Sequence, residues 1–194
     1  MKNTKTLKMT QLSLLIAILL IMAYTPLGYL RTPGLEISFL MVPVTVGAIV
    51  LGPSAGAILG LAFGLTSFRT CFGSSAFGTA LLSISFVKTF IVCVVARVLA
   101  GWLAGVIYKS CSKTKFSIAI TSLVSPLLNT LFFMGSLVIC FYNTEYIQNF
   151  ASVLGATNPF NFIVLFVGVQ GLIEAIVCFA ISGVVSKAVL KFSK

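Results

Sequence analysis

Residues 37–64 read ISFLMVPVTVGAIVLGPSAGAILGLAFG and contain no charged side chain. The Gly52-Pro53 pair favours a tight turn and divides the stretch into two apolar segments, residues 37–51 and 54–68. Each segment has about 15 residues, fewer than the ~17–25 of an ordinary transmembrane helix. Gly56, Gly60 and Gly64 lie on one face of the second segment. This face either permits close contact with a neighbouring helix or reflects plain packing.

The composition of the whole chain is that of an integral membrane protein. Of its 194 residues, 59% are hydrophobic and 8% are charged, and the mean hydropathy is +1.14. A soluble domain has about 25% charged residues. Four further apolar runs cover residues 9–24, 86–108, 116–142 and 160–189. The sequence therefore predicts an all-α fold in which six transmembrane helices form a single domain, residues 1–194.

The net charge of +10 would suggest a nucleic-acid partner in a soluble protein. Here the basic residues cluster at the ends of the apolar segments, where they act as topology determinants. If the N-terminus lies inside, the other side of the membrane receives only Arg31 and Arg69, with Lys88 at the membrane edge. The inner side receives Lys2, Lys5, Lys8, Lys109, Lys113, Lys115, Lys187, Lys191 and Lys194. We therefore expect both termini in the cytoplasm and no nucleic-acid partner.

Three polar residues fall near the midpoints of three predicted helices. Arg97 lies in the fourth helix, Asn129 in the fifth and Glu174 in the sixth. Because lipid offers no hydrogen bonds, each must face the interior of the bundle or a wet cavity. Gln170 lies one turn from Glu174 on the same helical face, while Lys88 lies nine residues before Arg97, on a face that only partly overlaps.

Two interpretations of these residues are open. In the first, Arg97 and Glu174 pair with each other, Asn129 bridges them, and the group only positions helices. In the second, Arg97 faces an anionic solute, because its planar fork suits a carboxylate, and Asn129 and Gln170 bind neutral polar groups. Both hold together if Glu174 supports Arg97 from behind.

The residues needed for catalysis or metal binding are scarce. The chain has no His and no Asp, and its three carboxylates, Glu36, Glu145 and Glu174, lie in separate segments. The five cysteines have no CxxC spacing, so a zinc, haem or iron–sulfur site is poorly supported. There is also no nucleotide-binding loop. We therefore expect no enzyme and no bound metal or cofactor, with any ATP used by partner subunits.

Several motifs resemble those of a known family. They are TPLG-x-L at residues 25–30, the stretch 37–64 quoted above with L-G-P-x-x-G-x-x-x-G at residues 51–60, and RVLAGWLAG at residues 97–105. Together they resemble the substrate-binding S-components of energy-coupling factor (ECF) vitamin transporters, over essentially the whole chain. The resemblance implies a multi-pass protein of the bacterial cell membrane that binds a vitamin from outside. It also implies partnership with a membrane coupling subunit and two ATPases, and release of the vitamin as the S-component topples in the membrane.

The resemblance also suggests roles for particular segments. Ser13 and Ala17 on the first helix are the nearest match to a small-residue face for the coupling subunit, and residues 27–36, with Tyr29, would form a lid. The stretches FLMVPV, TSFRTCFG and SPLLNTLFFM are most similar to the pantothenate-type members. Arg97 would then meet the carboxylate, with Asn129, Gln170, Glu174, Lys88 and Tyr29 as further candidate contacts. Riboflavin, folate and a stand-alone secondary carrier remain alternatives.

Overall fold

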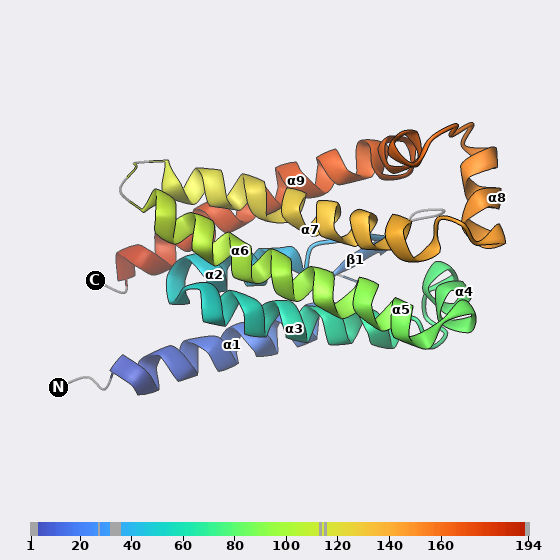
Figure 1. The fold of residues 1–194 in the computed structure, drawn as a ribbon. Helices are drawn as coiled ribbons and strands as arrows, with labels where there is room; N and C mark the ends of the chain where they lie inside the picture. The colour runs from blue at the N-terminus through green and yellow to red at the C-terminus, as the bar shows by residue number, and fades with distance from the viewer. Residues whose placement is uncertain (1–3, 27, 32–35, 113, 115, 193–194) are drawn as a thin grey trace.

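The computed structural model of the chain is a helical bundle with one short β-hairpin (Figure 1). It describes residues 4–26, 28–31, 36–112, 114 and 116–192. The elements in chain order are α1 (Thr4–Tyr24), β1 (Tyr29–Arg31), β2 (Glu36–Ser38), α2 (Met41–Leu51), α3 (Pro53–Thr70), α4 (Ala76–Ile84), α5 (Phe86–Phe90), the π-helix η1 (Ile91–Val95), α6 (Ala96–Cys111), α7 (Ser117–Phe141), α8 (Glu145–Val153) and α9 (Pro159–Phe192).

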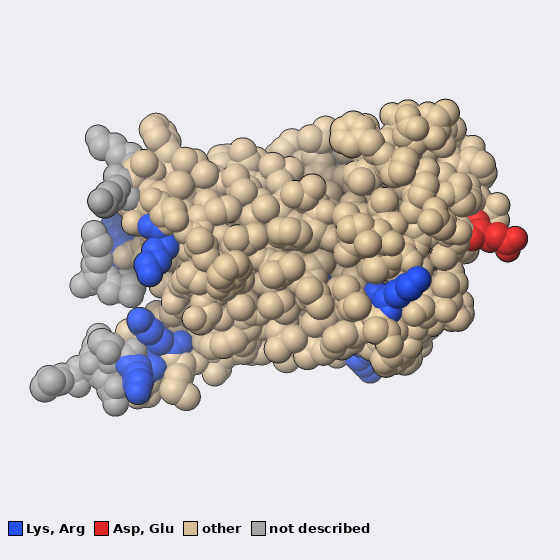
Figure 2. Space-filling model, viewed as in Figure 1, with Lys and Arg blue, Asp and Glu red and all other residues tan. Residues whose placement is uncertain are grey.

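The long helices run between two ends of the molecule, and the predicted all-α fold is confirmed. Both termini lie at one end, whereas α4 and α8 lie at the other (Figure 1). Within the described residues, four helical segments are long and apolar enough to cross a membrane: Lys5–Tyr24, Phe86–Cys111, Ser117–Phe141 and Gly171–Lys191. Lys and Arg side chains gather at the end that holds the termini, further basic side chains lie in the opposite half, and acidic atoms project at that opposite end (Figure 2). This distribution agrees with the charge asymmetry of the sequence.

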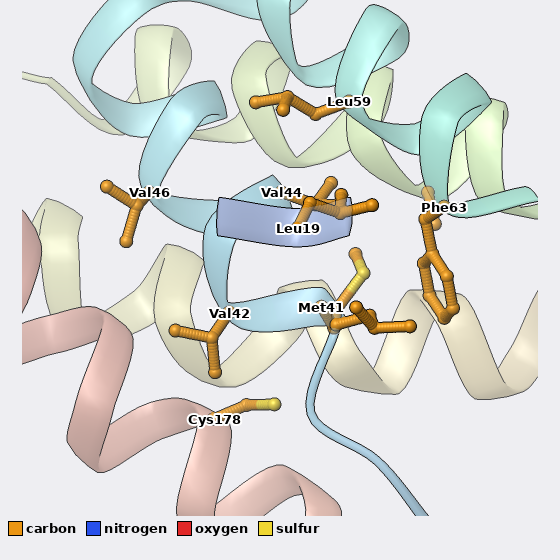
Figure 3. Packing of buried hydrophobic residues seen from close by; sticks show 10 residues of the cluster. Leu19, Met41, Val42, Val44, Val46, Leu59, Phe63 and Cys178 are labelled. Atoms are coloured by element: carbon orange, nitrogen blue, oxygen red, sulfur yellow. The ribbon is translucent and has the colours of Figure 1, made fainter. Parts of the chain in front are cut away.

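Helix α2 lies in the centre of the bundle, which explains why its apolar segment is short. Its residues from Met41 to Ile49 are all buried, and a helix that is hydrophobic on every side is a core helix. Figure 3 shows Val44 of α2 near Leu59 of α3, and Val42 on the side of Cys178 in α9. A helix enclosed in this way does not need the full thickness of the bilayer, because protein rather than lipid surrounds it.

The glycine face of α3 makes a close helix contact, which is the first of the two interpretations of its spacing. A Cβ atom added at Gly56 would meet the backbone carbonyl of Gly101, and one at Gly60 would meet that of Arg97. At Gly64 the nearest atom would be Cα of Val94, at 2.8 Å. The backbones of α3 and of the η1–α6 segment therefore touch along their length, an approach that only residues without a side chain allow. We call this contact the glycine seam.

Several boundaries differ from the predicted ones. The predicted helix of residues 37–51 starts at Met41, because residues 36–38 form strand β2. Helices α4 and α8 lie between predicted spans, where no helix is expected from the sequence; the hydroxyl of Ser75 caps α4 by accepting a hydrogen bond from the amide of Gly78 at 3.3 Å. The predicted helix of residues 160–189 is broken at Gly168, where φ is +37° and ψ is −130°. Glycine tolerates this conformation because it has no Cβ.

The predicted lid region contains the hairpin. Strands β1 and β2 pair antiparallel, with Tyr29 opposite Ser38, and the amide of Phe39 donates to the carbonyl of Gly28 at 2.9 Å. Within the predicted lid, residues 27 and 32–35 lie outside the described residues. The hairpin thus joins α1 to α2 as an ordered connection and brings Tyr29 and Ser38 to the edge of the cavity described next.

Candidate functional site

A cavity of about 490 Å³ lies in the half of the bundle that is remote from the termini. Its walls come from the hairpin, the last turns of α3, helix α4, the η1–α6 segment, the middle of α7, helix α8 and the broken region of α9. The volume falls within the ~300–1,000 Å³ range of small-molecule pockets. Aromatic and hydroxyl side chains line much of the wall. The wall also includes the guanidinium of Arg97, the amide of Asn129 and the carboxyl group of Glu174.

Arg97 is fixed on several sides. Its Nη1 donates hydrogen bonds to the carbonyls of Val92 and Cys93, both at 3.1 Å. Its Cζ lies 4.9 Å from the ring centroid of Phe63 and 4.8 Å from that of Phe133. Each cation–π contact of this kind contributes about 0.5–2 kcal/mol. The guanidinium is thus buried, oriented and aromatic-flanked while it still borders the cavity.

The π-helix explains how Arg97 reaches carbonyls of its own segment. In a π-turn the backbone hydrogen bonds run from i to i+5, so the carbonyls leave the regular α-helical ladder. Val92 and Cys93 lie in η1, and Arg97 follows its last residue by two positions. The carbonyls that accept from Nη1 are therefore those of the irregular turn. Such irregular turns are frequent at functional sites.

Asn129 and Glu174 complete the polar part of the wall. Asn129 is buried on α7, and Glu174 lies on α9 beyond the break at Gly168. The backbone amide of Ser38 hydrogen-bonds to the Glu174 carboxylate, which ties the hairpin to α9. Oδ1 of Asn129 and Oε1 of Glu174 are buried without a hydrogen-bond partner. A polar atom in this condition costs about 1–3 kcal/mol, so both side chains favour a partner that the cavity can admit.

Arg97 and Glu174 come together at the cavity without forming the direct pair of the first interpretation. Among the described residues, the hydrogen bonds of the guanidinium go to Val92 and Cys93, and Nε has no partner. Glu174 lies within electrostatic range of Arg97 but uses Ser38 as its hydrogen-bond donor. Among the described residues, both side chains therefore line one cavity, and no hydrogen bond joins them directly.

The other candidate residues have different positions. Tyr29 lines the cavity from β1. Lys88 does not line it: the side chain is exposed and its Nζ donates to the carbonyl of Cys140 at 3.2 Å. It lies in α5, nine residues before Arg97, and helix geometry places residues at this separation on nearly opposite faces. We therefore correct its placement. The backbone of Gln170 is helical, but its side chain lies outside the described part of the chain.

Several wall residues carry no clear signal in the sequence. They include Ser67, Thr70 and Thr130, the aromatic Tyr146 and Phe150 of α8, and the cysteines Cys71 and Cys93. Serine and threonine inside apolar helices usually bond to their own backbone, as Thr70 does to the carbonyl of Ser67 at 2.7 Å, so they do not stand out. Burial raises the pKa of Tyr146 above its ordinary value, so its phenol is neutral at physiological pH.

The first helix leaves one face uncovered. Ser13 and Ala17 are exposed on it, as are Met9, Leu14 and Ile21. Helix α1 contacts α2 and α3 through its other side, where Leu19 is fully buried. The exposed face therefore combines small and large apolar side chains along the outside of the bundle.

Comparison with protein-family models gives one match. The model for the substrate-specific component of ECF transporters covers residues 7–186. No curated protein matches the chain. The match spans every described helix that lines the cavity. The chain therefore belongs to the family of ECF transporter substrate-specific components.

Proposed function

We propose that this subunit binds pantothenate in the cavity around Arg97 and delivers it through an ECF module. The family makes the chain a substrate-specific membrane subunit. The identity of the solute is the proposal, and one observation carries it. Arg97, Asn129 and Glu174 all line the cavity, and each has a buried polar atom without a partner.

The unpartnered atoms match the chemistry of pantothenate. Nε of Arg97 is a donor, as a carboxylate requires, while Oδ1 of Asn129 and Oε1 of Glu174 are acceptors. Pantothenate has one carboxylate, one amide N–H and two hydroxyls, so it supplies the complementary groups. Small side-chain rotations on solute entry would satisfy all three atoms. Site specificity of this kind arises because a solute that lacks those groups leaves buried atoms unpaired.

The remaining wall suits the rest of the molecule. Phe63 and Phe133 each turn a face to the guanidinium, so these two rings orient Arg97 rather than sandwich an aromatic solute. Ser67 and Thr130 also line the cavity and add hydroxyl groups to its wall. A compact, branched, polar chain fits this combination better than a flat ring system.

We further propose that the cavity faces the outside of a bacterial cell and that both termini face the cytoplasm. Basic side chains gather mainly at the end that holds the termini (Figure 2). The cavity lies in the half of the bundle that contains α4 and α8. A coupling subunit would dock on the exposed α1 face around Ser13 and Ala17. Two partner ATPases would hydrolyse ATP, and this chain would neither catalyse a reaction nor bind a cofactor.

The test is to purify the chain alone in detergent and to identify co-purifying small molecules by mass spectrometry. Calorimetric titrations of the stripped protein with pantothenate, riboflavin and folate follow. We expect pantothenate to be recovered and to bind, and the two aromatic vitamins to give no heat of binding. Preferential binding of either aromatic vitamin would overturn the substrate assignment. Ion-dependent uptake by the chain alone in liposomes would overturn the dependence on partner ATPases.

A further inference from the structure

Two thiols meet in the wall of the cavity. Sγ of Cys71, at the end of α3, lies 3.9 Å from Sγ of Cys93 in the π-helix. Both cysteines are reduced, both are buried against protein, and both border the cavity. A disulfide has an S–S distance of about 2.05 Å, so the sulfurs need to approach by about 1.9 Å. Side-chain rotation and a small loop shift supply a movement of this size.

The glycine seam fixes the pair in register. Gly64 lies two turns before Cys71, and Val94 directly follows Cys93. A Cβ atom added at Gly64 would lie 2.8 Å from Cα of Val94. The α3 and η1 backbones therefore cannot slide past each other without a clash. The proximity of the thiols follows from the helix packing that forms the cavity, and it does not depend on an exposed loop alone.

We propose that Cys71 and Cys93 are a reversible dithiol–disulfide pair and that the disulfide form binds the solute more weakly. The effect on binding rests on the proposed function; formation of the bond does not. The oxidant would be a hydroperoxide small enough to enter the cavity, such as hydrogen peroxide. One thiol gives up its proton and its sulfur attacks a peroxide oxygen; the S–O bond of a sulfenic acid forms, the O–O bond breaks, and the departing hydroxide takes up that proton and leaves as water. The second thiol attacks that sulfur, the S–S bond forms, the S–O bond breaks, and a second water leaves.

The chain contains a mechanism for the effect on binding. Cys93 is held from two sides, because its carbonyl accepts from Nη1 of Arg97 and the seam presses on its neighbour. Cys71 lies where α3 ends and the connection to α4 begins. A Cβ added at Gly78 of α4 would meet Sγ of Cys71 at 2.7 Å, so α4 rests on this cysteine. Closing the disulfide therefore draws the α3–α4 connection and α4 into the cavity.

The reverse reaction needs two small thiols or one dithiol. The first external thiol attacks one sulfur, and the S–S bond breaks to give a mixed disulfide and one protein thiol; the second external thiol then releases the other protein thiol as the external disulfide forms. The cavity gives such a thiol the same access that it gives the peroxide. In the proposed orientation this cavity faces the outside of the cell, where oxidising conditions favour disulfides.

The first experiment measures bond formation without any solute. The full chain in detergent is treated with hydrogen peroxide, and an unreduced digest is analysed for a peptide that joins Cys71 to Cys93. We expect this cross-link in the wild type and in the Cys111→Ser and Cys140→Ser controls. It should be absent from Cys71→Ser and Cys93→Ser, with Cys71→Ala and Cys93→Ala as second variants where a serine disturbs folding. Sulfenic or sulfinic acid without the cross-link would overturn the proposal.

The second experiment measures the consequence. Pantothenate titrations compare the reduced protein, the peroxide-treated protein and the treated protein after dithiothreitol. We expect oxidation to weaken binding by about tenfold or more and dithiothreitol to restore it, because misplacing a polar site by about 1 Å is costly. Equal affinities would overturn the effect on binding. A reduced chain that does not bind pantothenate would instead refute the proposed substrate, while the cross-link result would stand separately.

Discussion

The central prediction concerns the charge at the cavity. Replacing Arg97 with methionine keeps an apolar stem of similar length and removes the guanidinium. In the wild type, Nη1 makes two hydrogen bonds of 3.1 Å and two rings flank the cation at 4.9 and 4.8 Å. This arrangement orients the fork before the solute arrives, so little side-chain entropy is lost on binding. In the Arg97→Met protein a bound carboxylate would be buried without its partner.

The expected loss follows from that comparison. Removing one partner of a buried charge pair costs about 3–5 kcal/mol, which corresponds to roughly 10²- to 5 × 10³-fold in Kd. Arg97→Lys retains the charge but loses the planar fork and its bonds to the two π-helix carbonyls. We expect it to bind about ten- to a hundredfold more weakly than the wild type, because one hydrogen bond to a charged group is worth about 1.5–3 kcal/mol. Isothermal titration calorimetry of the detergent-purified proteins with pantothenate measures both values.

An alcohol analogue provides the matched control. Pantothenol has a hydroxyl where pantothenate has its carboxylate, so it should bind the wild type and Arg97→Met with the same affinity within about threefold. The coupling in this cycle isolates the guanidinium–carboxylate interaction from other effects of the substitution. Size-exclusion profiles and melting temperatures establish that the variants are folded. Pantothenate binding by folded Arg97→Met within threefold of the wild type would refute the assignment.

Three further predictions test the packing, the carboxylate and the docking face. Gly60→Ala should destabilise the protein by about 1–3 kcal/mol, because the new methyl group meets the α6 backbone, whereas Gly135→Ala on α7 meets open space and should be neutral; thermal melts in detergent compare them. Glu174→Gln should fold normally, because an amide oxygen can still accept the backbone hydrogen bond of the hairpin; a loss of monodisperse protein would show a structural ion pair instead. Ala17→Leu on the exposed α1 face should abolish co-purification with the coupling subunit and leave solute binding intact, while Ala180→Leu, exposed on α9, should alter neither.

The sequence predicts those parts of the fold that depend on solvation and on backbone approach. Apolar runs identify the spanning helices because charged residues are expensive in lipid. Because Gly56, Gly60 and Gly64 recur every four residues, one face of the helix has no side chain to hold a neighbouring helix away. The structure shows the contact of this face with α6. Arg97 and Asn129 are identified for the same reason, since a polar group deep in the bilayer needs an internal partner.

The two short helices α4 and α8 were harder to predict. Each has nine residues, too few to span a membrane, and each follows a segment rich in glycine or polar residues. Their signal is amphipathic: Ile147 and Ala151 of α8 lie one turn apart and are buried, while the neighbouring polar residues are exposed. Over two turns this pattern is weak, and tertiary contacts decide whether such a helix forms.

The irregular backbone of the π-helix and of the break at Gly168 could not be predicted from the sequence for a different reason. The π-helix and the break at Gly168 each change the direction of a side chain without any change in composition. A glycine in a transmembrane helix indicates packing as readily as a break, so Gly168 alone does not select one. Lys88 lies outside the cavity wall for another reason: nine residues of regular helix make about two and a half turns, so Lys88 and Arg97 point to nearly opposite faces even without the π-turn.

The glycine seam connects these observations, because it positions the site without touching the solute. Gly60 brings the carbonyl of Arg97 against α3, and Phe63, less than one turn further along α3, then lies over the guanidinium at 4.9 Å. The distance between the α3 and α6 backbones and the distance from the Phe63 ring to the Arg97 guanidinium therefore change together. A side chain at residue 60 that separates the backbones also moves the ring away from the cation. Gly60→Ala should consequently weaken pantothenate binding in the fraction that folds, although residue 60 is absent from the cavity wall. Binding of wild-type strength by that folded fraction would mean that Phe63 does not orient Arg97, and that the hydrogen bonds to Val92 and Cys93 suffice.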